Sequence, residues 1–364
     1  MKIFNKIYLP LAVVAVSASL LFTGCEEETL IAPDFDRENE LLNPQNDPLD
    51  KWVASEFTTP YNIEVIWRWN RKETGYDRNY IPPTPSNVQP FLTVLKKAFI
   101  STYETNMGPE FIKPLIPKQF LLLGEWGYNN DGSRTLAQAE MGSKFVFYGV
   151  DHWDERYGSP GNYVYPNMRE AIHTMFHEFG HILHQNKLFT EDFQKVSKEH
   201  YTVRWTDFND LEARVKGFAS NYSMLNHNED FVELIAFYTT LTPEAWEEHI
   251  SSAVTAAEND EEIGGEPIDL EEAKKGYEAI LTKIALVKDY LKSSWDIDLD
   301  EVRDLALKNA DEALSNATIV PTTGSSVSVA PLRSPYTHHL VLCTAGEHPD
   351  SHFIEVTPEE TERN

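Results

Sequence analysis

The nine residues from Phe176 to His184, FHEFGHILH, constrain the fold more than any other stretch of this chain. His177 and His181 are four residues apart, so on a helix their imidazoles lie on one face and can converge on a single metal ion. Apolar residues recur around them at helical spacing, which predicts a largely buried helix over about residues 167–186. Such a helix needs a bound ion or hydrogen-bond partners for its histidines, because burying unpaired polar groups is costly.

The start of this helix is predicted from its capping residues. Asn167 is a favourable N-cap, and Glu170 stands three residues later, as in a capping box. The helix is therefore expected to begin directly after Asn167.

Three pairs of histidines on this helix have suitable spacing and compete for the metal: His173 with His177, His177 with His181, and His181 with His184. A hydrolytic zinc site also needs a carboxylate beside the ligands, close enough to take a proton from water. Only the pair His177 and His181 has one, because Glu178 follows its first member, whereas the other pairs have a threonine or an isoleucine there. We therefore predict His177 and His181 as zinc ligands and Glu178 as the general base.

A catalytic zinc usually has a third protein ligand and one position left for water. His184 and Lys187 occupy the places of the Gly and the third His of the extended three-histidine motif, so the third ligand must lie downstream. The available carboxylates are Glu191, Glu199, Glu212, Glu229 and Glu233. Glu229 has a second acid, Glu233, one turn later in a strongly helical segment, and such an acid commonly orients a ligand histidine. We predict Glu229 as the ligand and Glu233 as that second acid, with Glu199 and Glu233 as alternative ligands.

The rest of the chain predicts an α+β fold. Short apolar runs at 118–124 and 143–150 and the alternating stretch 61–70 are typical of strands of one small mixed sheet, and 87–104 has helical periodicity. After residue 186 the pattern is mostly helical. The 364 residues include 58 acidic and 31 basic side chains, a formal net charge of −27, which argues against nucleic acid as a partner.

The two ends of the chain differ from this central region. Residues 1–24 have a basic start, a short apolar core and a Phe-Thr-Gly end before Cys25, which is typical of a lipoprotein signal peptide that leaves Cys25 lipidated. Residues 25–50 are predicted to form an acidic tether, 51–312 a zincin-like catalytic domain, and 313–364 an undefined tail. The acids after Cys25 resemble those that direct some lipoproteins outward, so we expect an outer-membrane lipoprotein at the cell surface or periplasmic face.

The tail contains a group of potential metal ligands, namely His338, His339, Cys343, His348 and His352. Their spacing matches no known ligand pattern, so no role is predicted for them. If Cys25 is lipidated, Cys343 is the one remaining cysteine of the mature chain, and no intrachain disulfide can form.

The segment GFASNYSMLNHNEDFVELIAFY, residues 217–238, together with HEFGH resembles the zincins of the anthrax lethal factor type. The resemblance implies one zinc ion bound by His177, His181 and Glu229, with Glu178 as the base, Glu233 behind the ligands and Tyr222 as the donor to the oxyanion. From its own position alone, Tyr222 would be interpreted as a core tyrosine.

A wider resemblance covers the chain from about Trp52 to Ala310. The acidic lipoprotein start, the stretch FIKPLIPKQFLLLGEWGYNNDGSRTLAQAEMGSKFVFYGVDHW, the HEFGH helix and EDFVE are similar to the substrate import-associated zinc metallohydrolase lipoproteins. This similarity implies a zinc lipoprotein of the cell surface or periplasm that is encoded beside outer-membrane import systems for oligosaccharides or peptides.

We predict a zinc-dependent peptidase acting on a peptide or protein substrate, with Glu178 activating water while zinc and Tyr222 stabilise the oxyanion. We further expect the strand around Gly142–Gly149, GSKFVFYG, to lie at an edge of the sheet and to bind an extended peptide by strand addition. One alternative is a non-catalytic, zinc-stabilised substrate-binding lipoprotein of an uptake complex, and another is a zinc hydrolase of non-peptide amides. The intact Glu178 counts against the first alternative.

Overall fold

The computed structural model describes residues 47–70, 80–128, 134–135, 137–140, 144–154, 157–159 and 162–316. From Trp52 onward they belong to a single unit of the chain. Cys25, Cys343 and the tail histidines lie outside the described residues. The signal peptide, the tether, the catalytic domain limits and the undefined tail therefore stay predictions.

A four-stranded sheet forms one layer of the fold, in the order β1 (Glu64–Ile66), β2 (Gln119–Leu122), β6 (Lys144–Phe147) and β5 (Ala137–Glu140). The first three strands run parallel, and β5 pairs antiparallel with β6. Phe120 of β2 is in register with Phe145 of β6, and both are fully buried. The apolar runs that predict these strands are thus those of parallel strands covered on both faces.

The position of β6 contradicts the predicted edge strand around Gly142–Gly149. β6 is paired on both sides, with β2 and with β5, and all four of its residues are buried. A peptide cannot add to a strand whose backbone groups are already paired on both sides. The prediction is wrong because an uninterrupted apolar run marks a central strand, and the edges of this sheet are β1 and β5.

Residues 85–107 pack against both the sheet and the helix of the HEFGH motif. They form α5 (Pro85–Leu95), a π-helical turn and α6 (Ser101–Met107), which confirms the helical periodicity of this region. Phe91 contacts Phe147 of β6 with ring centroids 5.6 Å apart, and Phe99 contacts Phe176 of the motif at 5.0 Å. Aromatic packing therefore couples the sheet to the motif helix.

The motif helix, α7, spans Pro166–Asn186 and is buried over most of its length. The predicted capping box is wrong, because Tyr165 is the N-cap and no side chain caps the helix. Proline suits the first helical position, since its φ is preset and its missing N–H would have no partner there. Asn167 lies inside the first turn, where its Nδ2 donates to the backbone oxygen of His152 at 2.8 Å.

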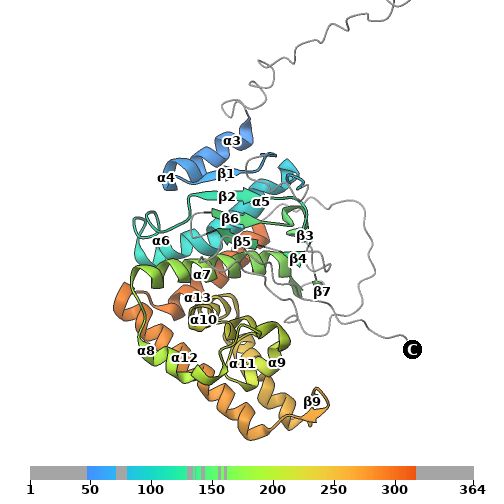
Figure 1. Cartoon of the computed structure of the whole chain (residues 1–364). Coiled ribbons are helices and arrows are strands. Elements are labelled where there is room, and N and C mark those ends of the chain that lie inside the picture. The colour runs from blue at the N-terminus through green and yellow to red at the C-terminus, as the bar shows by residue number, and fades with distance from the viewer. Residues whose placement is uncertain are drawn as a thin grey trace, which may run out of the picture. The chain divides into compact units, whose positions relative to one another are not determined.

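The C-terminal part is helical, and with the sheet it confirms the α+β class. Its helices are α8 (Glu191–Val196), α9 (Asp210–Val215), α10 (His227–Thr240), α11 (Pro243–Glu258), α12 (Leu270–Trp295) and α13 (Leu299–Asn316). At the start of the described chain lie α3 (Pro48–Val53) and α4 (Thr59–Tyr61). The described residues also form three two-stranded pairs: β3 (Gly127–Tyr128) with β4 (Arg134–Thr135), β7 (Tyr157–Ser159) with β8 (Asn162–Val164), and β9 (Glu262–Ile263) with β10 (Glu266–Pro267). α7 runs between the sheet and α10 (Figure 1). Within the described ranges, none of the helices has the length and apolar character of a membrane span.

α7 and α10 approach each other most closely at the glycine of the motif. A Cβ on Gly180 would lie 2.9 Å from Cγ1 of Val232 and 3.3 Å from Cδ1 of Ile235. Only a residue without a side chain lets the two helices pack at this distance. The close approach brings the start of α10 alongside the histidines of α7.

Candidate metal centre

Three buried side chains converge from two helices. His177 and His181 come from α7, and Glu229 comes from the first turn of α10. Oε2 of Glu229 lies 3.3 Å from Nε2 of His177 and 3.3 Å from Nε2 of His181. Ligand atoms about 2.0–2.2 Å from a tetrahedral zinc ion lie about 3.3–3.6 Å from one another, so these separations fit such an ion.

A side-chain cap fixes the position of Glu229. Oδ1 of Asn226 accepts hydrogen bonds from the backbone N–H groups of Asn228 at 2.8 Å and of Glu229 at 3.1 Å. An asparagine N-cap of this kind defines where the helix begins, and a carboxylate in the first turn is favoured by the helix dipole. The cap therefore holds the backbone from which Glu229 reaches the two histidines.

The pKa values of these residues show that the buried carboxylates strongly favour a positive charge at this position. Burial alone lowers the pKa of His177, but the carboxylates of Glu229 and Glu233 outweigh it and raise that pKa to about 10. Burial raises the pKa of Glu229, yet His177 and His181 together bring it down to about 2. Among the described residues, Nε2 of His177 is buried and has no hydrogen-bond partner of suitable geometry. A cation held between this nitrogen and the carboxylate would satisfy both.

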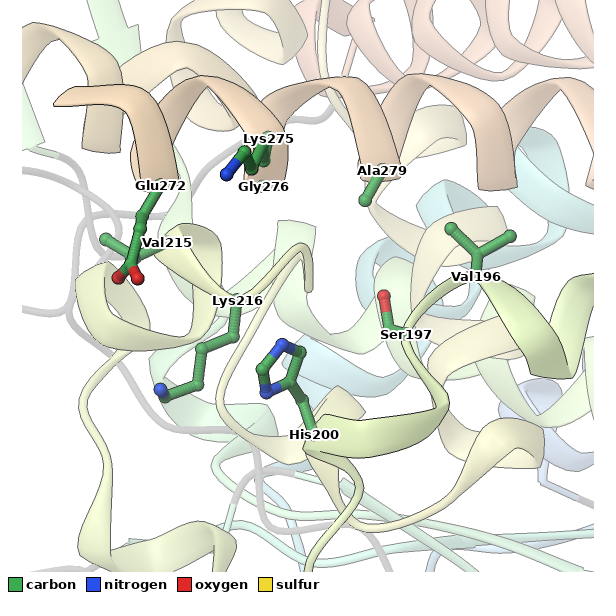
Figure 2. Close-up of a pocket in the computed structure, with 9 residues that line it drawn as sticks. All are labelled: Val196, Ser197, His200, Val215, Lys216, Glu272, Lys275, Gly276 and Ala279. Atoms are coloured by element: carbon green, nitrogen blue, oxygen red, sulfur yellow. The ribbon is translucent and has the colours of Figure 1, made fainter. Parts of the chain in front are cut away.

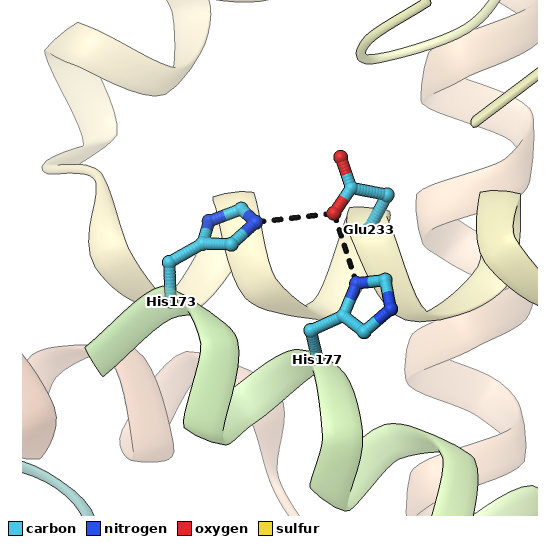
Figure 3. A group of neighbouring side chains, drawn as sticks. All are labelled: His173, His177 and Glu233. Carbon is cyan, nitrogen blue, oxygen red and sulfur yellow. Dashed lines mark hydrogen bonds and ion pairs between the residues drawn. The ribbon is translucent and has the colours of Figure 1, made fainter. Parts of the chain in front are cut away.

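Glu233 lies behind the ligands and accepts three hydrogen bonds. Its Oε1 accepts from Nδ1 of His177 at 2.9 Å and from Nε2 of His173 at 3.1 Å, as Figure 3 shows. Its Oε2 accepts from the hydroxyl of Ser220 at 2.6 Å. Although burial raises the pKa of a carboxyl group, the two histidines hold the pKa of Glu233 well below its usual range. With an ion bound, Glu233 would keep the remaining proton of His177 on Nδ1 and so direct the lone pair of Nε2 toward that ion.

His173, His177 and Glu233 form a second group that is compact enough to be considered for a metal. Both histidine nitrogens approach the same oxygen at hydrogen-bond distance, and the other oxygen accepts from Ser220. A second ion would require the loss of the proton that orients His177. We therefore describe this group as hydrogen-bonded support behind the candidate site of His177, His181 and Glu229.

His181 has a different supporting residue. Its Nδ1 lies 2.9 Å from Nε2 of His184, one turn later on the same helix. Burial lowers the pKa of His184 to about 4, so its imidazole is neutral and has one nitrogen available as an acceptor. With Nδ1 of His181 donating to His184, Nε2 of His181 keeps its lone pair for the metal.

Glu178 lies beside the ligands and has no fixed hydrogen bond on one of its oxygens. Its side chain is 5% exposed, and within the described part of the chain Oε1 has no hydrogen-bond partner. Burial raises the pKa of Glu178, in opposition to the nearby His177 and His181. A carboxylate with a raised pKa and an unsatisfied oxygen is suited to accept a proton.

Tyr222 also lies at this centre, in a short 3₁₀ turn (Tyr222–Met224) that precedes α10. Its ring centroid is 6.1 Å from that of His177 and 5.1 Å from that of Trp205. Burial, followed by the charge of Glu229, raises the pKa of Tyr222 well above its usual value, so its hydroxyl remains a hydrogen-bond donor. It is both a core residue and a neighbour of the metal ligands.

The other candidate ligands lie elsewhere. Glu199 is exposed in a 3₁₀ turn, and Glu191 is exposed at the start of α8. Glu212 accepts from the backbone N–H of Asn209 and thereby completes the capping box of α9. Ser220 is the supporting residue that sequence reasoning missed, since a serine before a tyrosine has no distinguishing pattern.

Comparisons with known proteins show the family to which the chain belongs. Residues 43–300 match a family described as "Putative zinc-binding metallo-peptidase", and this match covers more than two thirds of the chain. The chain belongs to this family. It is also similar to the crystal structure of "a putative zinc-binding metallo-peptidase from Bacteroides caccae ATCC 43185". The two share 25% sequence identity over 73% of this chain and 93% of that chain, with a TM-score of 0.57. No curated protein matches the chain.

Proposed function

We propose that this member of the zinc-binding metallo-peptidase family is an active zinc-dependent peptidase. The observation that carries the proposal is the buried Glu178, which lies beside the His177, His181 and Glu229 group with one oxygen that has no partner among the described residues. A zinc site that only stabilises the fold has no need of such a carboxylate, and burying it is costly.

When bound by His177, His181 and Glu229, zinc supplies a Lewis acid that lowers the pKa of a water molecule to near neutrality. Glu178 takes the proton of the attacking water and passes it to the departing amine. Its raised pKa suits both transfers, since the carboxyl group must hold the proton between the two steps.

The hydroxyl of Tyr222 donates a hydrogen bond to the oxyanion that develops on the attacked carbonyl. The proximity of its ring to His177 supports this role. Glu233 and His184 touch no reacting atom in this proposal; they hold the two ligand histidines with their Nε2 lone pairs toward the metal.

The cellular setting is part of the same proposal. The signal-like residues 1–24 and Cys25 support a lipid-anchored protein of the outer membrane, with an import complex as partner. A peptidase there would shorten peptides before their uptake. The competing function is zinc-stabilised binding without cleavage, which the chain's 8 Trp and 16 Tyr would suit through stacking on sugars.

Glu178→Gln tests the proposal in the purified mature protein, with zinc content measured beside cleavage of a broad peptide library. We expect bound zinc to be retained and cleavage to fall by about 10²- to 10⁴-fold, as for loss of a general base. The exposed Glu199→Gln is the matched control and should retain both zinc and cleavage. Loss of zinc from Glu178→Gln would contradict its role as base. A zinc-loaded unmodified protein that cleaves no peptide would favour the binding function or a non-peptide amide substrate.

A further inference from the structure

A cavity of about 310 Å³ lies between the end of α8, the turn after it, the end of α9 and the first half of α12. Figure 2 shows side chains of α12 along one wall and Ser197 and His200 on the facing side. None of the nine residues that line it belongs to the metal centre. Its volume is at the small end of the range of ligand-binding pockets, which suits a small molecule.

The floor of the cavity contains a buried hydroxyl group. Ser197 is 3% exposed, and within the described residues its Oγ has no hydrogen-bond partner. A buried polar atom in a native protein is nearly always satisfied by protein, water or ligand. Ser197 lines the cavity, so its side chain adds a polar group to a wall that is otherwise partly apolar.

The mouth of the cavity combines both signs of charge. Lys216 and Lys275 reach it from opposite sides, and Glu272 lies on the same face of α12 as Lys275. Among the described residues, neither lysine has a carboxylate within ion-pair distance; Lys216 has only the ring of Phe208, 5.7 Å from its Nζ. Two ammonium groups without a carboxylate partner are thus available at this site.

Small apolar side chains complete the walls, namely Val196, Val215 and Ala279. We propose that this cavity binds a free α-amino acid with a small aliphatic side chain. Lys216 and Lys275 bind its carboxylate, Glu272 binds its ammonium group, and the apolar walls take up the side chain. A phosphate fits less well, because Glu272 repels a dianion and the apolar walls offer it no partners.

The proposal is independent of zinc and of peptide cleavage, since it uses none of the residues of the metal centre. Saturation-transfer NMR with L-valine as the probe tests it on the full chain, both zinc-loaded and chelator-treated. We expect saturation transfer to L-valine in both forms. Its absence from both would overturn the proposal, and its loss on chelation alone would place L-valine at the metal centre instead.

Two analogues test which groups of the ligand are recognised. 3-Methylbutanoate retains the side chain and carboxylate of valine without the ammonium group, and isobutylamine retains the amine without the carboxylate. Each should bind at least about tenfold more weakly than L-valine, because each leaves charged groups of the protein unpaired. Binding of 3-methylbutanoate as tight as that of L-valine would exclude a role for Glu272 and contradict the proposal.

Variants locate the binding site. The surface pair Lys216→Gln with Lys275→Gln should weaken L-valine binding by about tenfold or more, and Ala279→Trp should abolish it by filling the cavity. Zinc binding, which this cavity does not involve, checks that each variant is folded. The matched control Lys274→Gln removes a neighbouring lysine that pairs with Glu271 and should leave binding unchanged. Unchanged binding in the folded double variant would overturn the proposal.

Discussion

Nδ1 of His181 lies 2.9 Å from Nε2 of His184, so a neutral histidine supports one metal ligand while a carboxylate supports the other. His184 can accept a hydrogen bond from the Nδ1–H group of His181 only while the Nε2 atom of His184 is unprotonated. Burial keeps it in that state by lowering its pKa to about 4. The two ligand histidines are thus oriented by partners of different charge.

His184→Leu should therefore weaken zinc binding by about 10- to 100-fold, as is usual when the partner of a ligand histidine is removed. His184→Gln should recover much of the affinity, because its amide oxygen can accept from Nδ1 of His181. Competition with a chromophoric chelator measures both variants. Equal losses in Leu and Gln variants would show that His184 acts through packing rather than through this hydrogen bond.

Gly180→Ala should destabilise the metal-free protein by about 1–3 kcal/mol, the usual cost of overpacking. The new Cβ would lie 2.9 Å from Cγ1 of Val232, which belongs to α10 itself. Urea unfolding gives the free energy, and zinc affinity should fall because Glu229 is displaced with α10. Adding Val232→Ala should restore part of the lost stability and part of the lost zinc affinity. Failure to restore either would show that a clash with Val232 is not the cause.

Lys283→Met should cost about 3–5 kcal/mol of unfolding free energy, since it leaves a buried carboxylate without its cation. Nζ of Lys283 lies 2.6 Å from Oδ2 of Asp230, both side chains are fully buried, and Tyr201 donates to the same carboxylate. Urea unfolding of the metal-free protein measures the change. Combining it with Asp230→Leu should recover much of the loss. Lys292→Met, which breaks an exposed ion pair, is the control and should cause no measurable change.

The stability of the metal-free protein should fall in mild acid in part because of His249. Its Nε2–H donates to the backbone oxygen of Ala219 at 2.8 Å, and burial holds its pKa well below the ordinary value. Below about pH 6.5 this histidine becomes protonated in the unfolded chain but stays neutral in the folded protein. The free energy of unfolding then decreases with falling pH, by up to about 1.4 kcal/mol per unit for this group.

His249→Phe should therefore flatten the decline of unfolding free energy between about pH 6.5 and pH 5, as measured by urea unfolding. The variant loses the hydrogen bond to Ala219 and so is expected to be less stable at neutral pH. The prediction therefore concerns only the slope of the unfolding free energy against pH, not its absolute value. An unchanged slope would show that His249 takes up a proton in the folded state.

Periodicity predicts the parts of this fold that depend on burial along one element. The apolar spacing around FHEFGHILH predicts α7, and the short apolar runs predict β2 and β6, because such patterns directly reflect which faces are covered. The neighbours of an element are not contained in its own pattern. The edge position expected for β6 is wrong for this reason. The helix α7 begins at Pro166 rather than after Asn167 because the preset φ of proline favours the first helical position.

The candidate site was likewise predictable only where it depends on spacing along a single helix. The pairing of His177 with His181 follows from helical spacing, and the Glu229 and Glu233 pair follows from the same rule on a second helix. That the two helices meet with Glu229 opposite the histidines depends on the contact at Gly180, which no local pattern contains. Ser220 and Lys283 were not predicted because their partners lie on other elements.

α10 buries three carboxylates, and all three have their partners on other elements. Glu229 meets the histidines of α7, Asp230 meets α12, and Glu233 meets α7 and Ser220. Turning α10 by one residue, about 100° around its axis, would separate all three from their partners at once. A chain assembled in a wrong register would therefore have no metal site at all. Such a misfolded copy could not bind an ion through these residues, so zinc would stabilise the correct register alone.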